Sequence, residues 1–524
     1  MSGEPIVITE PLGGSPLSRA ARAGQLPQWY RIIPRGTDWR AYVSDVRASV
    51  PANWYDELAP AFRAEGAALE RIRKSAGGKG IVVTTGQQPG MFGGALMTLV
   101  KAIAARALAD VIEEATGTPV APVFWAATDD ADFDEASVVS VALDGGAKEL
   151  RLTARSSAGT PMSRVPMSGT EVDALAVFLR EAAGSVAHPS YLEMALDAYR
   201  DGATVGDAYV SLMRGILQPL GIAVLDASHP AVSSAGRGIL ERAAREAVSL
   251  AEIVRVRGDE IRAAGFTPQV EEVANLSLVF ANSDGTKRRL TIDEAPSSRD
   301  AALSATVLVR PALERAILPT AAYVGGPGEV AYFAQVNAVA EALGIPTPLV
   351  VPRWSTTIVE PRIQRMLDEL GADPSMFADP HALEGRVARE HLPGDVARAI
   401  AEARAHAVHD ADALRRASVE LMPPAAIEGM ARTIEHRIAR LERRLLAAVK
   451  RRETDAMRRI ATARGSLFPH GVRQERKLSF IPFLARYGAP LLEQMLEAAG
   501  AHARAIVAGT PSMTPPPASA PARV

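Results

Sequence analysis

Apolar and polar positions alternate along two stretches of the chain in the order strand, helix, strand. The first stretch begins with the β-branched run at residues 81–85, passes through a glycine-rich loop into an apolar-periodic segment at about 95–112, and ends with the apolar run at 122–127. β-branched runs bounded by glycine favour strands, and apolar spacings of three and four favour a helix. Two strands joined by a helix over this length predict a parallel βαβ unit.

The same pattern returns at residues 321–351, where an apolar run meets a Gly-Gly-Pro-Gly loop, a helical segment at about 329–343 and another apolar run at 348–351. A further strand is expected at 222–226. Because these strands lie far apart in sequence, we predict an α/β fold with a Rossmann-like, parallel-sheet core that two inserted segments interrupt. The expected core comprises residues 1–145, 205–230 and 300–370, and the expected insertions are 146–204 and 231–299.

Residues 371–465 show a different pattern, with few glycines and no strong strand signal. Ile434, Ile438, Leu441, Leu445 and Ala448 follow one another at alternating steps of four and three, which is heptad spacing. The Pro423-Pro424 pair can end one helix and begin the next, so we predict an antiparallel coiled-coil hairpin. The alternative is a buried helix pair with no partner role. Residues 466–508 are expected to dock on the core, and 509–524 to be disordered.

Composition narrows the class of protein. A length of 524 residues exceeds one domain core, and a net charge of -2 without a basic stripe argues against nucleic-acid binding. Lys101 and Arg106 interrupt the longest apolar helix, so no membrane span is expected, and the N-terminus lacks a signal-peptide pattern. We therefore expect a cytoplasmic protein. The chain has no cysteine, so any thiol chemistry must belong to a substrate.

Ligands of doubly wound sheets bind beyond the carboxyl ends of the strands, which directs attention to the loops there. The loop at 86–94 is rich in glycine, so its backbone N–H groups could approach an anion at the start of the following helix. Its spacing matches neither the P-loop nor the dinucleotide fingerprint, and a plain strand-to-helix turn remains the alternative. Lys101 is expected at the surface. The candidate binding residues here are Gly86, Gln87, Gln88, Gly90, Gly93 and Gly94.

The loop at 128–135 holds five acidic groups within seven positions, directly after a predicted strand. Their mutual repulsion calls for a bound cation, a substrate ammonium or nearby arginines. One carboxyl group with a raised pKa could then act as a general base, so Asp129, Asp130 and Asp132 are the candidate catalytic residues. The alternative is a solvated turn in which an aspartate caps a helix. Trp125, on the preceding strand, joins the candidate binding residues.

Two further loops follow predicted strands. The guanidinium of Arg353 could hold a carboxylate or phosphate by a bidentate pair of hydrogen bonds, although a lone arginine can equally have a purely structural role. No histidine has a zinc-like partner spacing, so we expect no histidine-based metal site, and a metal requirement stays open. The candidate binding residues of these loops, together with Arg310, are Gly325, Gly326, Gly328, Glu329, Tyr332, Gln335, Arg353 and Ser355.

At these loops the chain resembles the bacillithiol-synthesis cysteine-adding enzymes. Residues 85–94 match their T-G-Q-Q-x-G-x-x-x-G motif, residues 122–135 match P-V-F-W-x-x-x-E-D-H-D-F-D-E, and residues 323–335 match Y-V-G-G-P-x-E-x-A-Y-x-A-Q. Further similarity at 269–270, 275–276, 308–311, 352–355 and 474–476 extends the resemblance over nearly the whole chain. Motifs of this length in this order are specific.

The resemblance implies a Rossmann-like core related to nucleotidyltransferases, a coiled coil that makes a homodimer, and a ligase that joins L-cysteine to glucosaminyl malate. Amide formation requires an activated carboxylate, so ATP or another nucleotide is the expected donor. The glycine loops would then hold the anionic substrate or the nucleotide phosphates. The acidic loop would receive an ammonium group of a substrate, and Arg310 and Arg353 would neutralise negative charge.

The chain departs from the family's second motif at two positions, of which the missing histidine matters for the chemistry. Where the family usually has Glu-Asp-His-Asp, this sequence has Asp129-Asp130-Ala131-Asp132, so an imidazole for proton transfer is missing. This difference keeps two alternatives open. One is a non-catalytic relative that binds a metabolite, and the other is a nucleotidyltransferase-like enzyme with a different acceptor.

Overall fold

The computed structural model describes residues 3–77, 79–153, 157–298, 302–417 and 421–510. The chain divides into two compact units. The first comprises Met1–Val141, Glu149–Val359 and Gln474–Val524, and the second comprises Ala142–Lys148 and Glu360–Arg473. Each unit is described below by itself.

The first unit is built on a six-stranded sheet with the strand order β12-β11-β3-β4-β7-β2. All neighbouring strands run parallel except β2, which is antiparallel to β7. The two predicted βαβ units and the predicted strand at 222–226 are confirmed. The six strands are β2 (Phe62–Arg63), β3 (Ile81–Gln87), β4 (Val120–Ala126), β7 (Ala223–Asp226), β11 (Thr320–Gly325) and β12 (Val350–Pro352).

Strands β3, β4 and β11 are buried along almost their whole length, as expected for parallel strands covered on both faces. Helix α5 (Leu96–Thr116) connects β3 to β4, and it ends at Gly117, whose φ of 72° is the left-handed conformation of a helix C-cap. Helix α14 (Pro327–Ala342) connects β11 to β12 and begins with proline at its first position. The remaining long C-terminal helix, α20 (Ile481–Ala508), packs against α5.

The strands of the main sheet come from residues 62–126, 223–226 and 320–352, so the core is discontinuous in sequence, as predicted. The exact bounds of the two insertions stay predictions. The segments between the strands carry a three-stranded antiparallel sheet, β10-β8-β9, and a two-stranded sheet, β5-β6. These strands are β5 (Val138–Leu143), β6 (Gly146–Arg151), β8 (Leu276–Ser283), β9 (Thr286–Thr291) and β10 (Ala302–Ala305), while β1 (Ile6–Thr9) pairs with β13 (Thr356–Val359).

The other helices of the first unit surround these sheets. They are α1 (Pro16–Arg22), α2 (Asp38–Ala48), α3 (Trp54–Leu58), α4 (Gly66–Gly77), α6 (Phe133–Ala136), α7 (Gly169–Ala183), α8 (Pro189–Ala198), α9 (Val205–Leu217), α10 (Pro230–Ala235), α11 (Arg237–Arg245), α12 (Ala247–Ala263) and α13 (Arg310–Ile317).

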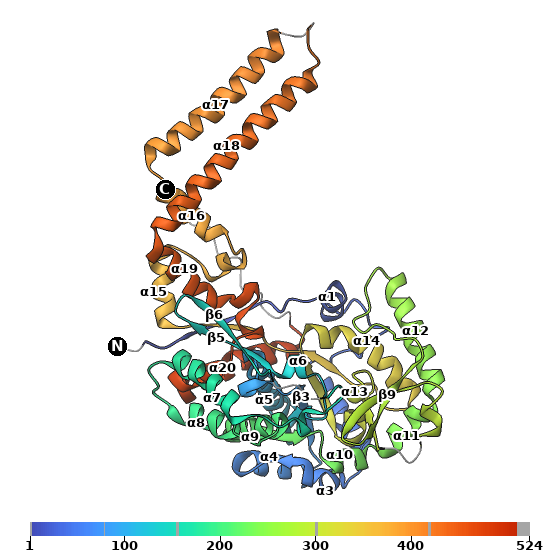
Figure 1. Cartoon of the computed structure of the whole chain (residues 1–524). Coiled ribbons are helices and arrows are strands. Elements are labelled where there is room, and N and C mark those ends of the chain that lie inside the picture. The colour runs from blue at the N-terminus through green and yellow to red at the C-terminus, as the bar shows by residue number, and fades with distance from the viewer. Residues whose placement is uncertain (1–2, 78, 154–156, 299–301, 418–420, 511–524) are drawn as a thin grey trace. The chain divides into compact units, whose positions relative to one another are not determined.

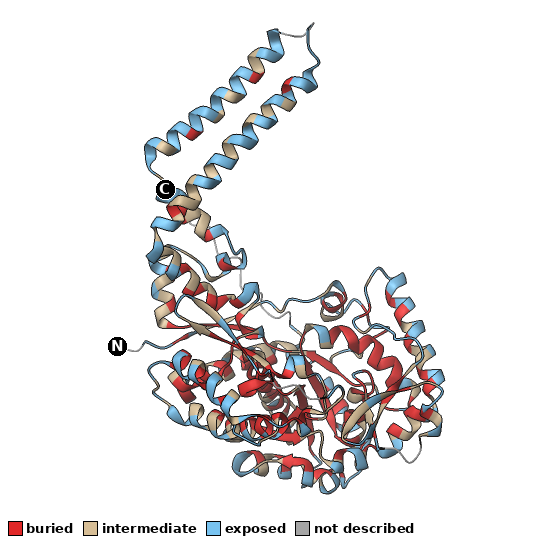
Figure 2. Cartoon of the chain, in the orientation of Figure 1, coloured by how far each residue is buried: buried red, intermediate tan, exposed pale blue. Residues whose placement is uncertain are grey.

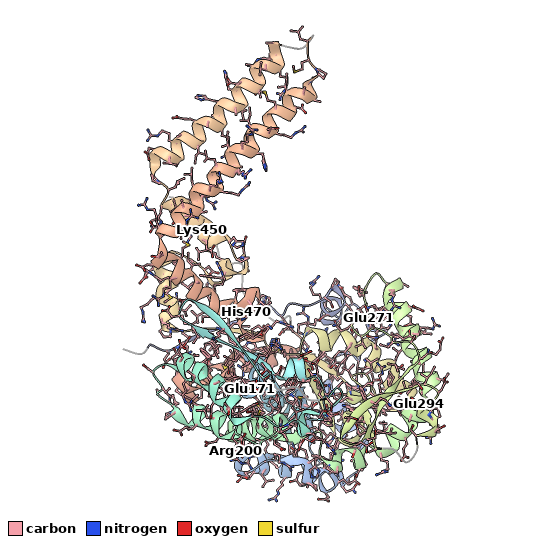
Figure 3. The ribbon with its side chains drawn as sticks, in the orientation of Figure 1. Glu171, Arg200, Glu271, Glu294, Lys450 and His470 are labelled. Carbon is pink, nitrogen blue, oxygen red and sulfur yellow. The ribbon has the colours of Figure 1, made fainter. Side chains whose placement is uncertain are left out.

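The second unit contains α15 (Pro361–Leu370), α16 (Ala382–Glu390), α17 (Gly394–Ala417), α18 (Pro424–Arg452) and α19 (Thr454–Leu467). Helices α17 and α18 lie side by side as a long hairpin, which confirms the predicted helix pair (Figure 1). Helix α18 begins at Pro424, as the proline pair indicated. Arg404 of α17 bonds Glu435 at 3.0 Å and Glu442 at 2.9 Å across the hairpin. Near its base, Lys450 bonds Glu384 of α16 at 3.1 Å (Figure 3).

Burial differs sharply between these elements. Buried residues concentrate in the main sheet and the helices on it, whereas the hairpin is mostly exposed (Figure 2). Among the described helices, none is long and apolar enough to cross a membrane. Residues 511–524, most of the tail that we expected to be disordered, lie outside the described residues.

Candidate functional site

A cavity of about 530 Å³ lies beyond the carboxyl ends of β4 and β7 in the first unit. Trp125 and Asp129 contribute from the end of β4, Ser228 from the end of β7, and Arg310 from the start of α13. Its volume falls within the roughly 300–1,000 Å³ of small-molecule pockets, and its position is where parallel α/β sheets bind ligands. Three of the predicted site residues, Trp125, Asp129 and Arg310, therefore meet around one cavity.

One wall of this cavity is the segment at residues 159–164, which the backbone holds from two sides. Met162 N donates to Asp130 O at 2.8 Å, and Ser163 N donates to Thr128 O at 3.0 Å, so the segment is tied to the acidic loop. On the other side, Lys287 N of β9 donates to Gly159 O at 2.8 Å. These bonds bring the acidic loop and the β8–β9 hairpin to the same cavity, although they are more than 150 residues apart.

Arg310 is anchored in a buried polar cluster behind the cavity. Its Nη1 atom bonds Glu314 Oε2 at 3.0 Å, and its Nη2 atom lies 3.3 Å from the Tyr323 hydroxyl and 3.5 Å from the Tyr332 hydroxyl. Thr84 of β3 donates to the other oxygen of Glu314. Burial raises the pKa of Glu314, while the Arg310 charge and the Thr84 bond oppose that rise. The guanidinium is thus held in one orientation by side chains from three elements.

Lys101 is buried, with 2% of its side chain exposed, so the prediction of a surface lysine is wrong. Its Nζ atom bonds Gly86 O at 2.5 Å, Gln87 Oε1 at 3.2 Å and Glu329 Oε2 at 2.7 Å. These acceptors replace the water that a buried ammonium loses. Burial lowers the pKa of Lys101, and the Glu329 charge opposes that shift. The lysine therefore links the end of β3 to the start of α14.

The acidic loop obtains its counter-charge from the chain itself. Lys287 Nζ lies 3.0 Å from Asp129 Oδ2 and 2.8 Å from Asp129 O. Asp130 Oδ1 accepts from Asp132 N at 2.8 Å, and Asp132 Oδ1 accepts from Glu135 N at 3.0 Å, which caps α6. Asp132 thus caps a helix, as the alternative interpretation of this loop as a solvated turn proposed. A catalytic role for Asp129, Asp130 and Asp132 stays a prediction.

The glycine loop after β3 uses its N–H groups internally. Gly93 N donates to Gly90 O at 3.0 Å and to the Tyr199 hydroxyl at 3.1 Å, and Gly94 N donates to Met91 O at 2.9 Å. At the start of α5, Leu96 N bonds Leu478 O at 2.7 Å. Gly93 has a φ of 83°, and a Cβ atom there would lie 2.6 Å from the Phe480 ring, so packing alone requires glycine. The N–H groups of Gly93 and Gly94, two of those that we expected to face an anion, therefore have partners in the chain.

The loops after β11 and β12 are also occupied by the protein's own side chains. Glu329 Oε2 accepts from Gly326 N at 2.7 Å, which places a carboxylate at the start of α14. Gln335 bonds the backbone of Val270 at 2.8 and 3.1 Å. Arg353, 1% exposed, forms a bidentate pair with Glu475 at 2.7 and 2.8 Å. The Glu475 carboxylate thus makes the bidentate contact with Arg353 that we expected a substrate carboxylate or phosphate to make.

Arg353 and Ser355 line a second cavity in the first unit, of about 810 Å³, together with the N-terminal segment and the end of α20. Ser355 Oγ donates to Glu475 Oε1 at 2.9 Å. Five of the predicted site residues are therefore divided between two cavities, three in the first and two in the second. The remaining ones line neither: Asp130, Asp132, Gly86, Gln87, Gln88, Gly90, Gly93, Gly94, Gly325, Gly326, Gly328, Glu329, Tyr332 and Gln335.

Sequence reasoning missed several residues that shape these sites, namely Lys101, Arg164, Lys287, Glu314 and Glu475. For Lys101 a signal existed, because it is the lone charged residue in the apolar run at 95–105. Arg164 lines the cavity, and Lys287 bonds Asp129, through tertiary contacts that no local pattern encodes. Among the described residues, no group of three or more histidine, aspartate or glutamate side chains is placed to hold a metal ion.

Comparison with known proteins identifies relatives along nearly the whole chain. The family model described as "Bacillithiol biosynthesis BshC, N-terminal Rossmann-like domain" matches residues 52–301 and 291–354, and the model of the "C-terminal coiled-coil domain" of the same family matches 356–505. A protein of Koribacter versatilis is 29% identical over 92% of this chain and 94% of its own length. Relatives from Solibacter usitatus (30% identical; 78% of this chain, 81% of the relative) and Heliobacterium modesticaldum (32%; 82% and 83%) are similar. All three carry the name cysteine ligase BshC as a provisional assignment.

Proposed function

Because the chain belongs to the bacillithiol biosynthesis BshC family, we propose that it is a ligase that joins L-cysteine to glucosaminyl malate. The observation that carries this proposal is the 530 Å³ cavity, which presents a fixed guanidinium and a carboxylate to the same space. Glucosaminyl malate has carboxylates at one end and an amine at the other, so it matches both groups.

Arg310 would bind a substrate carboxylate. Its hydrogen bonds to Glu314 and the two tyrosines use three of the five guanidinium N–H donors, which leaves two. Asp129 would receive the substrate ammonium. Of its two carboxylate oxygens, Lys287 bonds only Oδ2, and Oδ1 has no partner among the residues that the structure describes. The cavity thereby orients the amine that attacks the activated carboxyl group of cysteine, and holding the reactants in place lowers the barrier.

An amide does not form from a free carboxylate and an amine without activation, so on this chemical ground we propose ATP or another nucleotide as the donor. The two glycine loops do not fit its phosphates. The Gly93 and Gly94 N–H groups are bonded within their loop, and Glu329 already occupies the start of α14. We therefore assign no phosphate contact to them.

The test is formation of the cysteine adduct by purified protein from cysteine and glucosaminyl malate, with and without ATP, followed by mass spectrometry. We expect adduct from the unmodified protein, and a loss of at least about 100-fold in kcat/KM for Arg310→Gln and Asp129→Asn. Arg255→Gln, an exposed arginine on α12, is the control and should retain activity. Absence of adduct with any nucleotide would overturn the proposal.

Ala131 favours a second candidate, a non-catalytic relative that binds the same metabolite. It would be supported if calorimetry detects binding of glucosaminyl malate while no nucleotide yields adduct. Adduct formation with another amine in place of glucosaminyl malate would instead support a nucleotidyltransferase-like enzyme with a different acceptor.

We also propose that the α17–α18 hairpin makes a homodimer. Apolar side chains along it remain open to solvent in a single chain, among them Val408 at 59%, Leu421 at 87% and Leu441 at 54% exposure. An exposed apolar seam on a long helix pair is stabilised when a second copy covers it. The proposed compartment is the cytoplasm, where a thiol substrate stays reduced.

A further inference from the structure

The 530 Å³ cavity has a second guanidinium, that of Arg164, which comes from a different element than Arg310. The charged residues that line the cavity are Asp129, Arg164, Asp284 and Arg310. Lys287 neutralises Asp129, and Glu314 neutralises Arg310. Among the described residues, no ion pair or hydrogen bond engages the Arg164 guanidinium. Arg164 is therefore a lining cation without an ion-pair partner among the described residues, and Arg310 retains two N–H donors for a ligand.

The backbone beneath Arg164 is fixed. Arg164 N donates to Pro161 O at 2.8 Å, and the two preceding residues, Met162 and Ser163, bond the acidic loop at 2.8 and 3.0 Å. A side chain on such a short, tied segment starts from a defined position at the cavity wall. This lowers the conformational entropy lost when it binds a ligand.

The β8–β9 hairpin makes room for the Arg164 side chain. Gly285 at its turn has a φ of 82°, and a Cβ atom there would lie 3.0 Å from Arg164 Nη1. The guanidinium thus lies over the turn. Neutral hydrogen-bonding side chains also line this cavity: Ser163, Ser228, Ser233, Asn282, Thr286 and Ser304.

We propose that Arg164 and Arg310 bind two separate carboxylates of one substrate, so that the cavity selects a dicarboxylate over a monocarboxylate of the same shape. Each guanidinium can form charge-assisted bonds with one carboxylate. The hydroxyl and amide groups that line the same cavity suit the oxygen atoms of an alkoxy-dicarboxylate attached to a sugar. This inference rests on the proposed function, because it assigns the malyl end of that substrate to this cavity.

The experiment compares glucosaminyl malate with glucosaminyl lactate, which carries a methyl group in place of one carboxymethyl group. For each compound, kcat/KM in the ligation assay and Kd from calorimetry without cysteine are measured. We expect the unmodified protein to favour the dicarboxylate by roughly 10- to 100-fold, the size of one hydrogen-bonded charge contact. Arg164→Gln should reduce this ratio to below about threefold, mainly by weakening binding of the dicarboxylate.

Two matched variants make the outcome specific. Arg164→Lys keeps the charge without the planar fork and should retain part of the preference. Arg180→Gln, an exposed arginine of α7 that does not line the cavity, should leave the ratio unchanged. Because Arg164 is exposed, its replacement should not compromise folding.

The two readouts separate this inference from the proposed function. If no ligation occurs but the Kd ratio persists and depends on Arg164, the ligase proposal fails and the dicarboxylate site stands. Equal affinity for both compounds, no binding of either, or an Arg164→Gln protein with the unmodified ratio would overturn the inference, even if ligation is observed.

Discussion

Lys101 Nζ lies 2.7 Å from Glu329 Oε2, and this ion pair connects the central helices α5 and α14. Lys101 also bonds Gly86 O at the end of β3, while Glu329 accepts from Gly326 N just after β11. The Tyr323 hydroxyl donates to Glu329 and lies 3.3 Å from Arg310 Nη2. A continuous polar chain thus runs from two glycine loops to the guanidinium of the cavity, and it makes these loops part of the support of the site.

Breaking this pair should destabilise the fold strongly. Lys101→Met leaves the partly buried Glu329 carboxylate, 20% exposed, without its counter-charge, and the loss of one partner of a buried pair typically costs about 3–5 kcal/mol. We expect a fall of this size in the free energy of unfolding, measured by urea denaturation followed by circular dichroism. Lys74→Met removes an exposed lysine that pairs with Glu113, and as the control it should change stability by less than about 1 kcal/mol.

The double variant Lys101→Met with Glu329→Gln tests the cause. Because it removes both charges, it should be more stable than the sum of the two single losses predicts. Simple additivity of the two losses would show that packing, and not the charge pair, accounts for the effect.

The pH dependence of stability should reveal the raised pKa of Glu135. Partial desolvation raises the pKa of Glu135, although its side chain is exposed at the surface; the charges of Asp132 and Asp130 add to the rise, and Lys101 and Arg476 oppose it. A raised carboxyl pKa means that ionisation is less favourable in the folded state. The stabilising contribution is therefore full below the unfolded pKa of about 4.3 and is lost as pH rises through the folded value. Glu135→Gln should then be more stable than the unmodified protein at pH 7.

The difference between the two proteins should vanish below about pH 4, where both carry a neutral side chain at this position. Guanidinium denaturation midpoints at pH 3.5, 5 and 7 provide the measurement. Glu149→Gln, on β6, is a control carboxylate without these acidic neighbours. If Glu135→Gln were less stable than the unmodified protein at pH 7, the inferred repulsion would be absent.

The main strands of the core could be anticipated because parallel strands buried on both faces appear as short, continuous apolar runs. Residues 81–85 and 122–127 needed no tertiary information to be recognised. The helix pair was equally visible, since heptad spacing and the Pro423-Pro424 pair are local signals. Local sequence patterns were therefore sufficient to predict the strands of the core and the helix pair.

The partners of charged side chains were beyond local patterning. The acidic loop indicated that a counter-charge was needed, but nothing near it in sequence pointed to Lys287, 158 positions away. Arg353 was rightly noted as a bidentate donor, yet its acceptor, Glu475, lies 122 positions away. Such pairs depend on which loops the fold brings together. The sequence therefore predicted the kinds of charged group in these loops better than the residues with which they pair.

The hairpin should control the oligomeric state. Replacing Ile438 and Leu441 together by aspartate places two charges on the apolar seam of α18, and we expect monomers by light scattering where the unmodified protein is a dimer. The control, Thr433→Asp with His436→Asp, adds the same two charges at exposed positions of the same helix and should stay dimeric. An unmodified protein that is monomeric at micromolar concentration would refute the dimer.

The last prediction concerns Ala131, which stands where relatives offer an imidazole between acids. It lies half-buried in the turn between Asp130, whose carbonyl accepts from Met162 N, and α6, and its own carbonyl accepts from Phe133 N at 3.1 Å. A methyl group can neither transfer a proton nor donate a hydrogen bond. General acid–base assistance typically contributes roughly 100- to 10,000-fold in rate, so Ala131→His should raise cysteine-adding activity by at least about tenfold.

The pH profile and the neighbouring acids decide how this gain arises. If the new imidazole transfers a proton, kcat/KM of Ala131→His should acquire an inflection near pH 6.5 that Ala131→Gln, of similar size and without a titrating group, does not show. A gain without the inflection would instead assign the effect to substrate binding. Should the unmodified protein already turn over at about 1 to 1,000 per second and lose this activity on Asp130→Asn or Asp132→Asn, the carboxylates carry the proton transfer and the histidine is dispensable.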